Sequence, residues 1–247
     1  MNGKIKATAN LDGRSNLEEA IRKESLNITE FRSMELLNHY GISVNQGILA
    51  KDAGSVITAA KKLSGPVALK IQSAEIPHKS AAGGVKLNLI DEQEIINGFN
   101  TIIKNIETNS PKAKMDGVLV QKMVEPGLEI ILGITNKDGF GPILMVGFGG
   151  TSVETSGDVA FALCPVTPER CENLLGKLRG NVLLDKDKYD LRALFSLMTN
   201  LSNFAMSVQN LISEIDLNPV ILHSAGNGIS VVDALMVKFD KSMENRS

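Results

Sequence analysis

Three oxygen-bearing side chains near the C-terminal end could hold a divalent cation. Asp216 and Asn218 lie two residues apart in one apolar segment, and Asp233 lies in the next. If these segments pair as a hairpin with an even-numbered loop, the three side chains share one face. Carboxylate and amide oxygens suit Mg²⁺, which leaves coordination positions open for phosphates. A solvent-facing polar row explains the pattern equally well, and Pro219 favours an edge strand.

The loop 72–84 contains one histidine and ends in two glycines. Gly83 and Gly84 would allow backbone N–H groups to turn toward an anion. A neutral imidazole such as that of His78 can accept a phosphoryl group. A solvated loop histidine without a chemical role also fits the local pattern, so both interpretations stay open.

Two further features are compatible with phosphate binding. Lys70 alternates with Leu69 and Ile71 in a predicted strand, and its ammonium group either faces solvent or binds a phosphate. Gly149 and Gly150 form a glycine-rich break after another strand. Their spacing matches neither a P-loop nor a dinucleotide fingerprint, so a tight turn is the simpler interpretation.

The composition excludes several classes of protein. The 247 residues carry 26 basic and 28 acidic side chains, which argues against a nucleic-acid surface or a polybasic membrane anchor. No uncharged run reaches the length of a membrane helix, and the start has no signal-peptide core. Two cysteines, Cys164 and Cys171, cannot form a disulfide framework. We therefore expect a soluble cytoplasmic protein with two buried thiols.

Alternating helical and strand patterns predict an α+β protein with two subdomains. Helices are predicted after Thr29, Asp52, Asp91, Thr167 and Asp190, each residue acting as an N-cap. Predicted strands include short segments at 42–44 and 67–71 and a final pair at 212–222 and 229–237. The predicted organisation is an N-terminal surface arm 1–26, a first subdomain 27–124, a second subdomain 125–239 and a tail 240–247.

In this order, the segments resemble the ATP-grasp subunit of the nucleoside-diphosphate-forming acyl-CoA synthetases, typified by the β subunit of ADP-forming acetyl-CoA synthetase. The resemblance covers about residues 27–239. The most specific pieces are His78-Lys79-Ser80 followed by Gly83-Gly84-Val85, Glu214-Ile215-Asp216-Leu217-Asn218-Pro219, and Val232-Asp233-Ala234. The family usually has Asp after His-Lys-Ser, where this chain has Ala81.

The resemblance implies an ATP-grasp fold with ATP or ADP between the two subdomains and Mg²⁺ held by Asn218 and Asp233. His78 would carry a phosphoryl group on a swinging loop, with Asp216 as a second catalytic residue. The implied nucleotide-binding residues are Lys70, Gly83, Gly84, Gln121, Lys122, Met123, Glu129, Gly149 and Gly150.

The resemblance also implies a partner. Phosphate would pass between His78 and a second phosphohistidine on a CoA-binding α subunit, in an assembly of α2β2 type. No glycine-rich βαβ unit suitable for CoA is visible in this chain. The overall reaction would couple acyl-CoA cleavage to ATP formation. The alternatives are another ATP-grasp ligase, such as a succinyl-CoA synthetase-type β subunit or a carboxylate–amine ligase, and a nucleotide-binding regulatory module without turnover.

Overall fold

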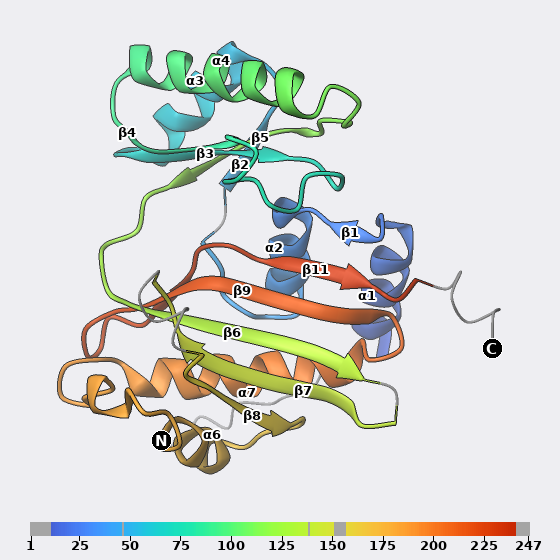
Figure 1. Cartoon of the computed structure of the whole chain (residues 1–247), viewed down its shortest axis with the longest axis vertical. Coiled ribbons are helices and arrows are strands. Elements are labelled where there is room, and N and C mark those ends of the chain that lie inside the picture. The colour runs from blue at the N-terminus through green and yellow to red at the C-terminus, as the bar shows by residue number, and fades with distance from the viewer. Residues whose placement is uncertain (1–10, 46, 138, 151–156, 241–247) are drawn as a thin grey trace.

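The computed structural model describes residues 11–45, 47–137, 139–150 and 157–240. These residues form two lobes, each built around its own antiparallel sheet (Figure 1). The predicted α+β class is confirmed. The predicted tail lies outside the described residues except for Asp240.

The small lobe is one continuous stretch of chain. Its four-stranded sheet has the order β2-β5-β3-β4, and two helices lie over one face (Figure 1). Aliphatic side chains of the strands and helices form a core of their own between these two layers. The elements are β2 (Gly47–Ala50), α3 (Ala53–Leu63), β3 (Val67–Gln72), β4 (Val85–Leu89), α4 (Glu92–Asn109) and β5 (Gly117–Lys122).

The two helices of the small lobe begin at the predicted caps. The Asp52 carboxylate accepts a hydrogen bond from the Ser55 backbone N–H at 2.8 Å, and Asp91 accepts one from Glu94 at the same distance. Each cap satisfies a backbone donor that the helix itself leaves unpaired. The predicted apolar face of α4 is buried against the sheet, through Ile95, Phe99, Ile102 and Ile106.

The large lobe contains a seven-stranded sheet with the order β1-β11-β9-β6-β7-β8, and β10 pairs with β9. Its N-terminal elements are α1 (Leu11–Lys23), β1 (Asn27–Ile28) and α2 (Glu30–His39). Its remaining elements are β6 (Leu128–Lys137), β7 (Gly141–Phe148), β8 (Val159–Leu163), α6 (Pro168–Leu175), the 3₁₀ helix η1 (Asn181–Leu183), α7 (Leu191–Ser207), β9 (Ile212–Leu222), β10 (Ile229–Val231) and β11 (Leu235–Lys238).

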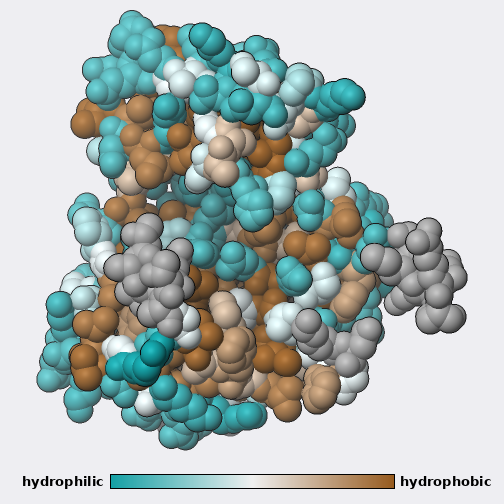
Figure 2. All heavy atoms as spheres, viewed as in Figure 1, coloured by the Kyte–Doolittle hydropathy of each residue, from teal (hydrophilic) through white to brown (hydrophobic). Residues whose placement is uncertain are grey.

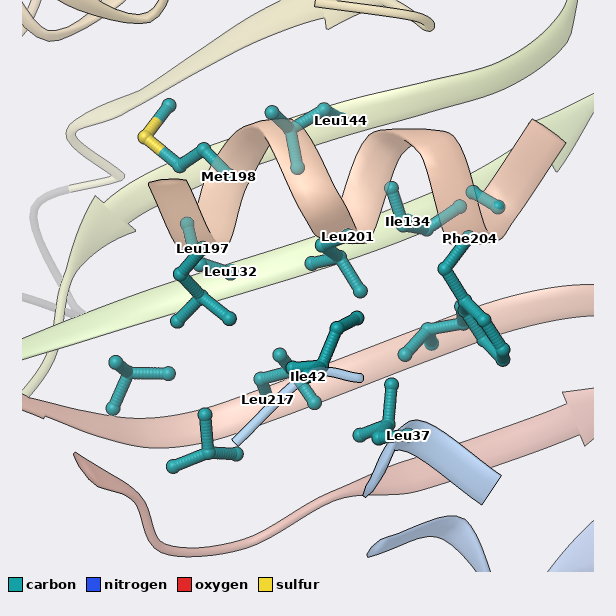
Figure 3. Close-up of a cluster of buried hydrophobic side chains, with 14 of the residues drawn as sticks. Leu37, Ile42, Leu132, Ile134, Leu144, Leu197, Met198, Leu201, Phe204 and Leu217 are labelled. Atoms are coloured by element: carbon teal, nitrogen blue, oxygen red, sulfur yellow. The ribbon is translucent and has the colours of Figure 1, made fainter. Parts of the chain in front are cut away.

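Helix α7 lies along the sheet of the large lobe and supplies much of its core (Figure 3). The predicted apolar stripe is buried, including Leu194, Met198 and Leu201. Each large aliphatic side chain removed from water in this way stabilises the fold by about 1.5–3 kcal/mol. At the C-terminal end of α7, the Phe204 ring meets Tyr40 edge-to-face, with ring centroids 5.1 Å apart. The segment after α2 therefore packs into this core.

The N-terminal region differs from the expectation of a surface arm followed by a first subdomain 27–124. In α1, Leu17 and Ile21 are buried in the core of the large lobe. Strand β1 pairs with β11, with Asn27 opposite Val237. Residues 27–42 thus belong to the large lobe, because the partner that completes their burial lies at the far end of the chain. The predicted boundary near residue 125 falls in the connection between β5 and β6.

Two predicted strands also differ from the structure. Residues 42–44 form no strand; Ile42 and Val44 pack in the core of the large lobe, and the Asn45 N–H donates to the Val231 carbonyl at 3.0 Å. The predicted strand 229–237 is divided into β10 and β11, and residues 232–234 lie between them. Within the described ranges, none of the helices is both long and apolar enough to cross a membrane.

Candidate active site

The two lobes contact each other around the buried side chain of Lys70. Lys70 lies in β3 of the small lobe, and its Nζ is 2.6 Å from Glu30 Oε1 of α2. The same Nζ donates to the Val232 carbonyl at 2.9 Å. The Lys70 side chain is 6% exposed and that of Glu30 is fully buried. Lys70 therefore does not face solvent, and its ammonium group joins the two lobes.

Lys79 is the second ammonium group at this junction. Its Nζ lies 3.0 Å from Glu30 Oε2 and 3.1 Å from Asp233 Oδ1. Two lysines from the small lobe thus face two carboxylates from the large lobe, and the four charges cancel. We call Glu30, Lys70, Lys79 and Asp233 the charge cluster.

The charge cluster shifts the pKa values of its members. Burial raises the pKa of Glu30, while the ammonium group of Lys70 opposes this effect by stabilising the ionised carboxylate. Burial alone lowers the pKa of Lys79, but the carboxylates of Glu30 and Asp233 outweigh it and raise that pKa above its usual value. Lys79 therefore remains a cation at neutral pH.

His78 is exposed at the start of the loop that precedes β4. The loop folds into a compact turn, in which the Gly84 N–H donates to the Lys79 carbonyl at 2.8 Å. Gly83 has φ +71°, and its carbonyl accepts a hydrogen bond from the Asn105 side chain at 2.9 Å. At Gly84, an added Cβ would lie 2.3 Å from Ile71 Cγ2. The two predicted glycines therefore shape and anchor the loop that carries His78.

The three predicted metal-site residues lie in β9 and beside it. Asp216 pairs with Leu235 of β11, and continuing that register places Asn218 opposite Asp233. The Val232 N–H donates to the Pro219 carbonyl at 3.1 Å, which holds the two segments together at this point. Asp216 is exposed, whereas Asn218 and Asp233 are partly buried.

These oxygen donors fit a magnesium ion that also binds phosphates. Among the residues that the structure describes, no group of three or more His, Cys, Asp or Glu side chains could hold a metal. One carboxylate and one amide oxygen, from Asp233 and Asn218, suffice for Mg²⁺ when waters and phosphates complete its octahedron. The cationic group of Lys79 already lies at Asp233, so this carboxylate is placed to hold positive charge.

The predicted nucleotide-binding residues Gln121, Lys122 and Met123 lie at the end of β5 and directly after it, where the chain leaves the small lobe. Gln121 is buried, and its amide group donates to the Asn45 carbonyl. The Lys122 carbonyl accepts a hydrogen bond from the Asn45 side chain at 3.0 Å. The Met123 N–H donates to the Pro66 carbonyl at 2.9 Å. The Gln121 side chain thus links the two connecting segments, whereas the Lys122 side chain is exposed.

Glu129 and the two glycines after β7 lie together. The Gly149 N–H donates to the Glu129 carbonyl at 2.8 Å, and an added Cβ at Gly149 would lie 2.9 Å from Glu129 Cβ. Gly150 has φ +91°, a conformation that favours glycine. The continuation of this loop, residues 151–156, lies outside the described residues.

Sequence reasoning missed two members of the charge cluster, Glu30 and Lys79. Glu30 carried a signal, because it lies on the buried side of α2 in helical register with Ser33, Met34 and Leu37. An acidic residue within an apolar stripe indicates a buried charge with a partner. Nothing in the local pattern around Lys79 identified the carboxylates it faces, because both belong to the other lobe.

The comparisons with known proteins agree with this geometry. A family described as an ATP-grasp domain matches residues 19–237. The chain is 31% identical over 225 residues to the β subunit of an ADP-forming acetate–CoA ligase II from Pyrococcus furiosus, covering 90% of this chain and 95% of that subunit. It is 36% identical over 220 residues to an ADP-forming 4-hydroxybutyrate–CoA ligase from Nitrosopumilus maritimus, covering 87% of this chain but 31% of that relative. The chain therefore spans about a third of this relative and nearly all of the separate β subunit.

Solved structures of one protein from Ca. Korarchaeum cryptofilum, a dinucleotide-forming acetyl-coenzyme A synthetase 1, have the same fold. The complex with coenzyme A and Ca-AMPCP superposes with a TM-score of 0.84 at 32% identity, covering 92% of this chain and all of that chain. In another structure, with coenzyme A and Mg-AMPPCP, its phosphohistidine segment points towards the nucleotide binding site; the TM-score is 0.75 at 30% identity, with the same coverage. These matches show that the chain belongs to the ATP-grasp family and, within it, to the ADP-forming acyl-CoA synthetases.

Proposed function

We propose that this chain is the nucleotide-binding β subunit of an ADP-forming acyl-CoA synthetase, and that it transfers phosphate between ATP or ADP and His78. The proposal rests on one observation: three features lie together at the junction of the lobes. They are the buried Lys70, the oxygen donors Asn218 and Asp233, and the loop of His78. ATP-grasp ligases use ATP or ADP, and this junction is where the family's nucleotide would bind.

The side chains present suit phosphoryl transfer. Lys70 would exchange part of its pairing with Glu30 for the phosphates of the nucleotide, because an ammonium group is a compact point charge. Asn218 and Asp233 would hold Mg²⁺, which when bound neutralises charge on the phosphate oxygens. Gly149, Gly150 and Glu129 would border the nucleotide, while backbone atoms at 121–123 would run past its base.

His78 would be the nucleophile. A nitrogen of its neutral imidazole attacks the γ-phosphorus of ATP, the bond to the bridging oxygen breaks, and ADP leaves with that electron pair. In the reverse direction, ADP accepts the phosphoryl group and the imidazole is regenerated. We place Asp216, exposed on the same strand face as Asn218, near the path of the phosphate as an auxiliary catalytic residue.

The complete reaction needs a second subunit. The Pyrococcus furiosus relative is a β subunit, and relatives such as the Nitrosopumilus maritimus ligase are about three times longer than the region they share with this chain. We propose a CoA-binding α subunit, with its own phosphohistidine, in an α2β2 assembly. The acyl substrate would be bound mainly by that partner.

Phosphohistidine formation tests the proposal. The chain, co-expressed with a CoA-binding subunit from the same genome, is incubated with Mg²⁺ and γ-labelled ATP. We expect a label on His78 that is acid-labile and base-stable, as a phosphohistidine is and a phosphoserine on Ser80 would not be. His78→Asn should lose the label and the turnover but retain ADP binding. Asp233→Asn should instead lose the Mg²⁺-dependent part of ADP binding.

The result also separates the alternatives. A carboxylate–amine ligase would use a free acyl phosphate and leave His78 unlabelled. A regulatory module would bind nucleotide without label or turnover. If the folded chain binds neither ADP nor ATP at millimolar concentration by calorimetry, a nucleotide-binding role for this junction is wrong.

A further inference from the structure

Lys79 connects the His78 loop to the large lobe. Its side chain, next in sequence to the exposed His78, extends inward and is 12% exposed. There it contacts the carboxylates of Glu30 and Asp233 at 3.0 and 3.1 Å. Both acceptors belong to the large lobe, whereas the loop itself is part of the small lobe. The Lys79 contacts therefore fix where the backbone of His78 lies.

The other end of the loop is held differently. Gly83 accepts a hydrogen bond from Asn105 of α4, and Gly84 packs closely on Ile71 of β3. These contacts are all within the small lobe, so they persist when the lobes move relative to each other. The Lys79 contacts cross to the large lobe near Asp233, and at the start of the loop the Asn27 side chain of β1 also donates to the Ala74 carbonyl at 3.2 Å. Loss of the Lys79 contacts would release the segment around His78 from Asp233, while the loop stays anchored at Ala74 and at the two glycines.

Asp233 cannot serve Lys79 and a metal ion equally well. Its Oδ1 is the atom that Lys79 approaches, and the same carboxylate is the proposed ligand of Mg²⁺. A divalent cation beside this carboxylate would repel the ammonium group at short range. Occupation of the site by metal and nucleotide should therefore weaken the Lys79 contact to Asp233.

We propose that Lys79 is a positioning residue that holds the His78 loop against Asp233 in the nucleotide-free protein and is displaced when metal and nucleotide bind. This inference rests on the proposed function. Binding of Mg-ADP and docking of the loop then oppose each other. Because such coupling is reciprocal, removing Lys79 should strengthen Mg-ADP binding and loosen the loop.

The experiment compares Lys79→Gln with Lys104→Gln, which removes the same charge from the exposed face of α4. Calorimetry gives the Kd for ADP with and without Mg²⁺, and hydrogen–deuterium exchange follows peptides that cover residues 76–84. We expect Lys79→Gln to bind Mg-ADP about fivefold more tightly than the wild type. We also expect its loop to exchange rapidly without nucleotide. Lys104→Gln should match the wild type in both measurements, and Lys79→Arg should restore slow exchange.

The wild-type protein provides a test that needs no variant. Adding Mg-ADP should speed exchange at residues 76–84, whereas ADP with a chelator should do so much less. This inference would be wrong, but the proposed function would stand, if Lys79→Gln left both the Kd and the exchange rate unchanged. The same holds if Mg-ADP did not speed exchange at residues 76–84 in the wild type. Weaker Mg-ADP binding by Lys79→Gln would also overturn the inference, since Lys79 would then be a phosphate ligand. If the wild type and Lys104→Gln both fail to bind Mg-ADP, both the proposed function and this inference are wrong.

Discussion

Glu30 and Lys70 form a buried ion pair that crosses from one lobe to the other, with Oε1 and Nζ 2.6 Å apart. Neither side chain retains appreciable contact with water. Each charge therefore depends on its partner, since water cannot replace the lost interaction. Lys70 is therefore both a member of the ion pair on which stability depends and the proposed phosphate-binding lysine.

Removing the carboxylate should strongly destabilise the protein. Glu30→Ala leaves the buried Lys70 without a carboxylate partner and Lys79 with Asp233 alone, and we expect the free energy of unfolding to fall by about 3–5 kcal/mol. Urea denaturation followed by circular dichroism measures this change. The control is Glu92→Ala, which breaks the Lys61–Glu92 pair, where both side chains are more than half exposed. That change should cost about 1 kcal/mol or less, and equal effects would argue against a special role for the buried pair.

The close approach at Gly84 gives a second prediction. In Gly84→Ala the new Cβ would lie 2.3 Å from Ile71 Cγ2 and 3.1 Å from the Lys79 carbonyl oxygen. The loop or β3 must shift, and we expect a loss of about 1–3 kcal/mol in the free energy of unfolding. Gly54→Ala is the matched control, because its Cβ would meet only Asp52 Oδ1, at 3.4 Å, in the first turn of α3.

The control should be stabilising, by about 0.5–1 kcal/mol, because alanine restricts the unfolded chain and favours the helix. Chemical denaturation of both variants gives the comparison. If Gly84→Ala were as stable as the wild type, the loop would have to be free to move away from Ile71, which contradicts the anchored arrangement.

Asp158 gives a prediction about pH. Its carboxylate accepts hydrogen bonds from the backbone N–H groups of Arg179 and Gly180 at 2.9 and 2.8 Å, and these bonds lower its pKa. Its stabilising contribution is therefore complete above the unfolded-state pKa of about 3.9 and disappears as pH falls through the lower folded-state value. Melting temperatures measured between about pH 2 and pH 6 should fall less steeply in Asp158→Asn than in the wild type. A wild-type slope in Asp158→Asn would mean that the two backbone hydrogen bonds do not favour the ionised carboxylate.

The two cysteines should be unreactive in the folded protein. Burial raises the pKa of Cys164 to about 11 and also raises the pKa of Cys171. Alkylation requires the thiolate, which is scarce at pH 8 under these conditions. Iodoacetamide at pH 8 should therefore leave both thiols unmodified for a time that fully alkylates the guanidinium-unfolded chain, as measured by intact mass. Of the two thiols expected to be buried, Cys171 is buried and Cys164 is only partly buried, so rapid labelling of Cys171 in the native protein would contradict the structure.

Sequence reasoning succeeded where the determining interactions are local. The caps at Asp52 and Asp91 accept hydrogen bonds from backbone groups three residues away, so the pattern contains both partners. The apolar face of α7 can likewise be predicted from the spacing of its apolar residues alone. The resemblance rests on equally local information, because short specific segments such as His78-Lys79-Ser80 contain the residues that we propose to be functional.

Sequence reasoning failed where a residue interacts with residues far away in the sequence. Leu17 and Ile21 looked too few to anchor a helix, yet they fit a core supplied by the rest of the large lobe. Lys70 has the alternation of a solvent-facing residue, and only the placement of Glu30 from the other lobe explains its burial. A cluster whose charged residues come from both lobes is hard to predict from the sequence of any one segment.

The pairing of β1 with β11 also determines the order in which the protein can fold during synthesis. The small lobe consists of chain from 47 to 122 and has its own core, so it can form while later residues are still being translated. The large lobe cannot close its sheet until β11, at residues 235–238, has left the ribosome. Until then β1 and α2 have no complete core to join, so their apolar side chains cannot reach their final burial during most of synthesis.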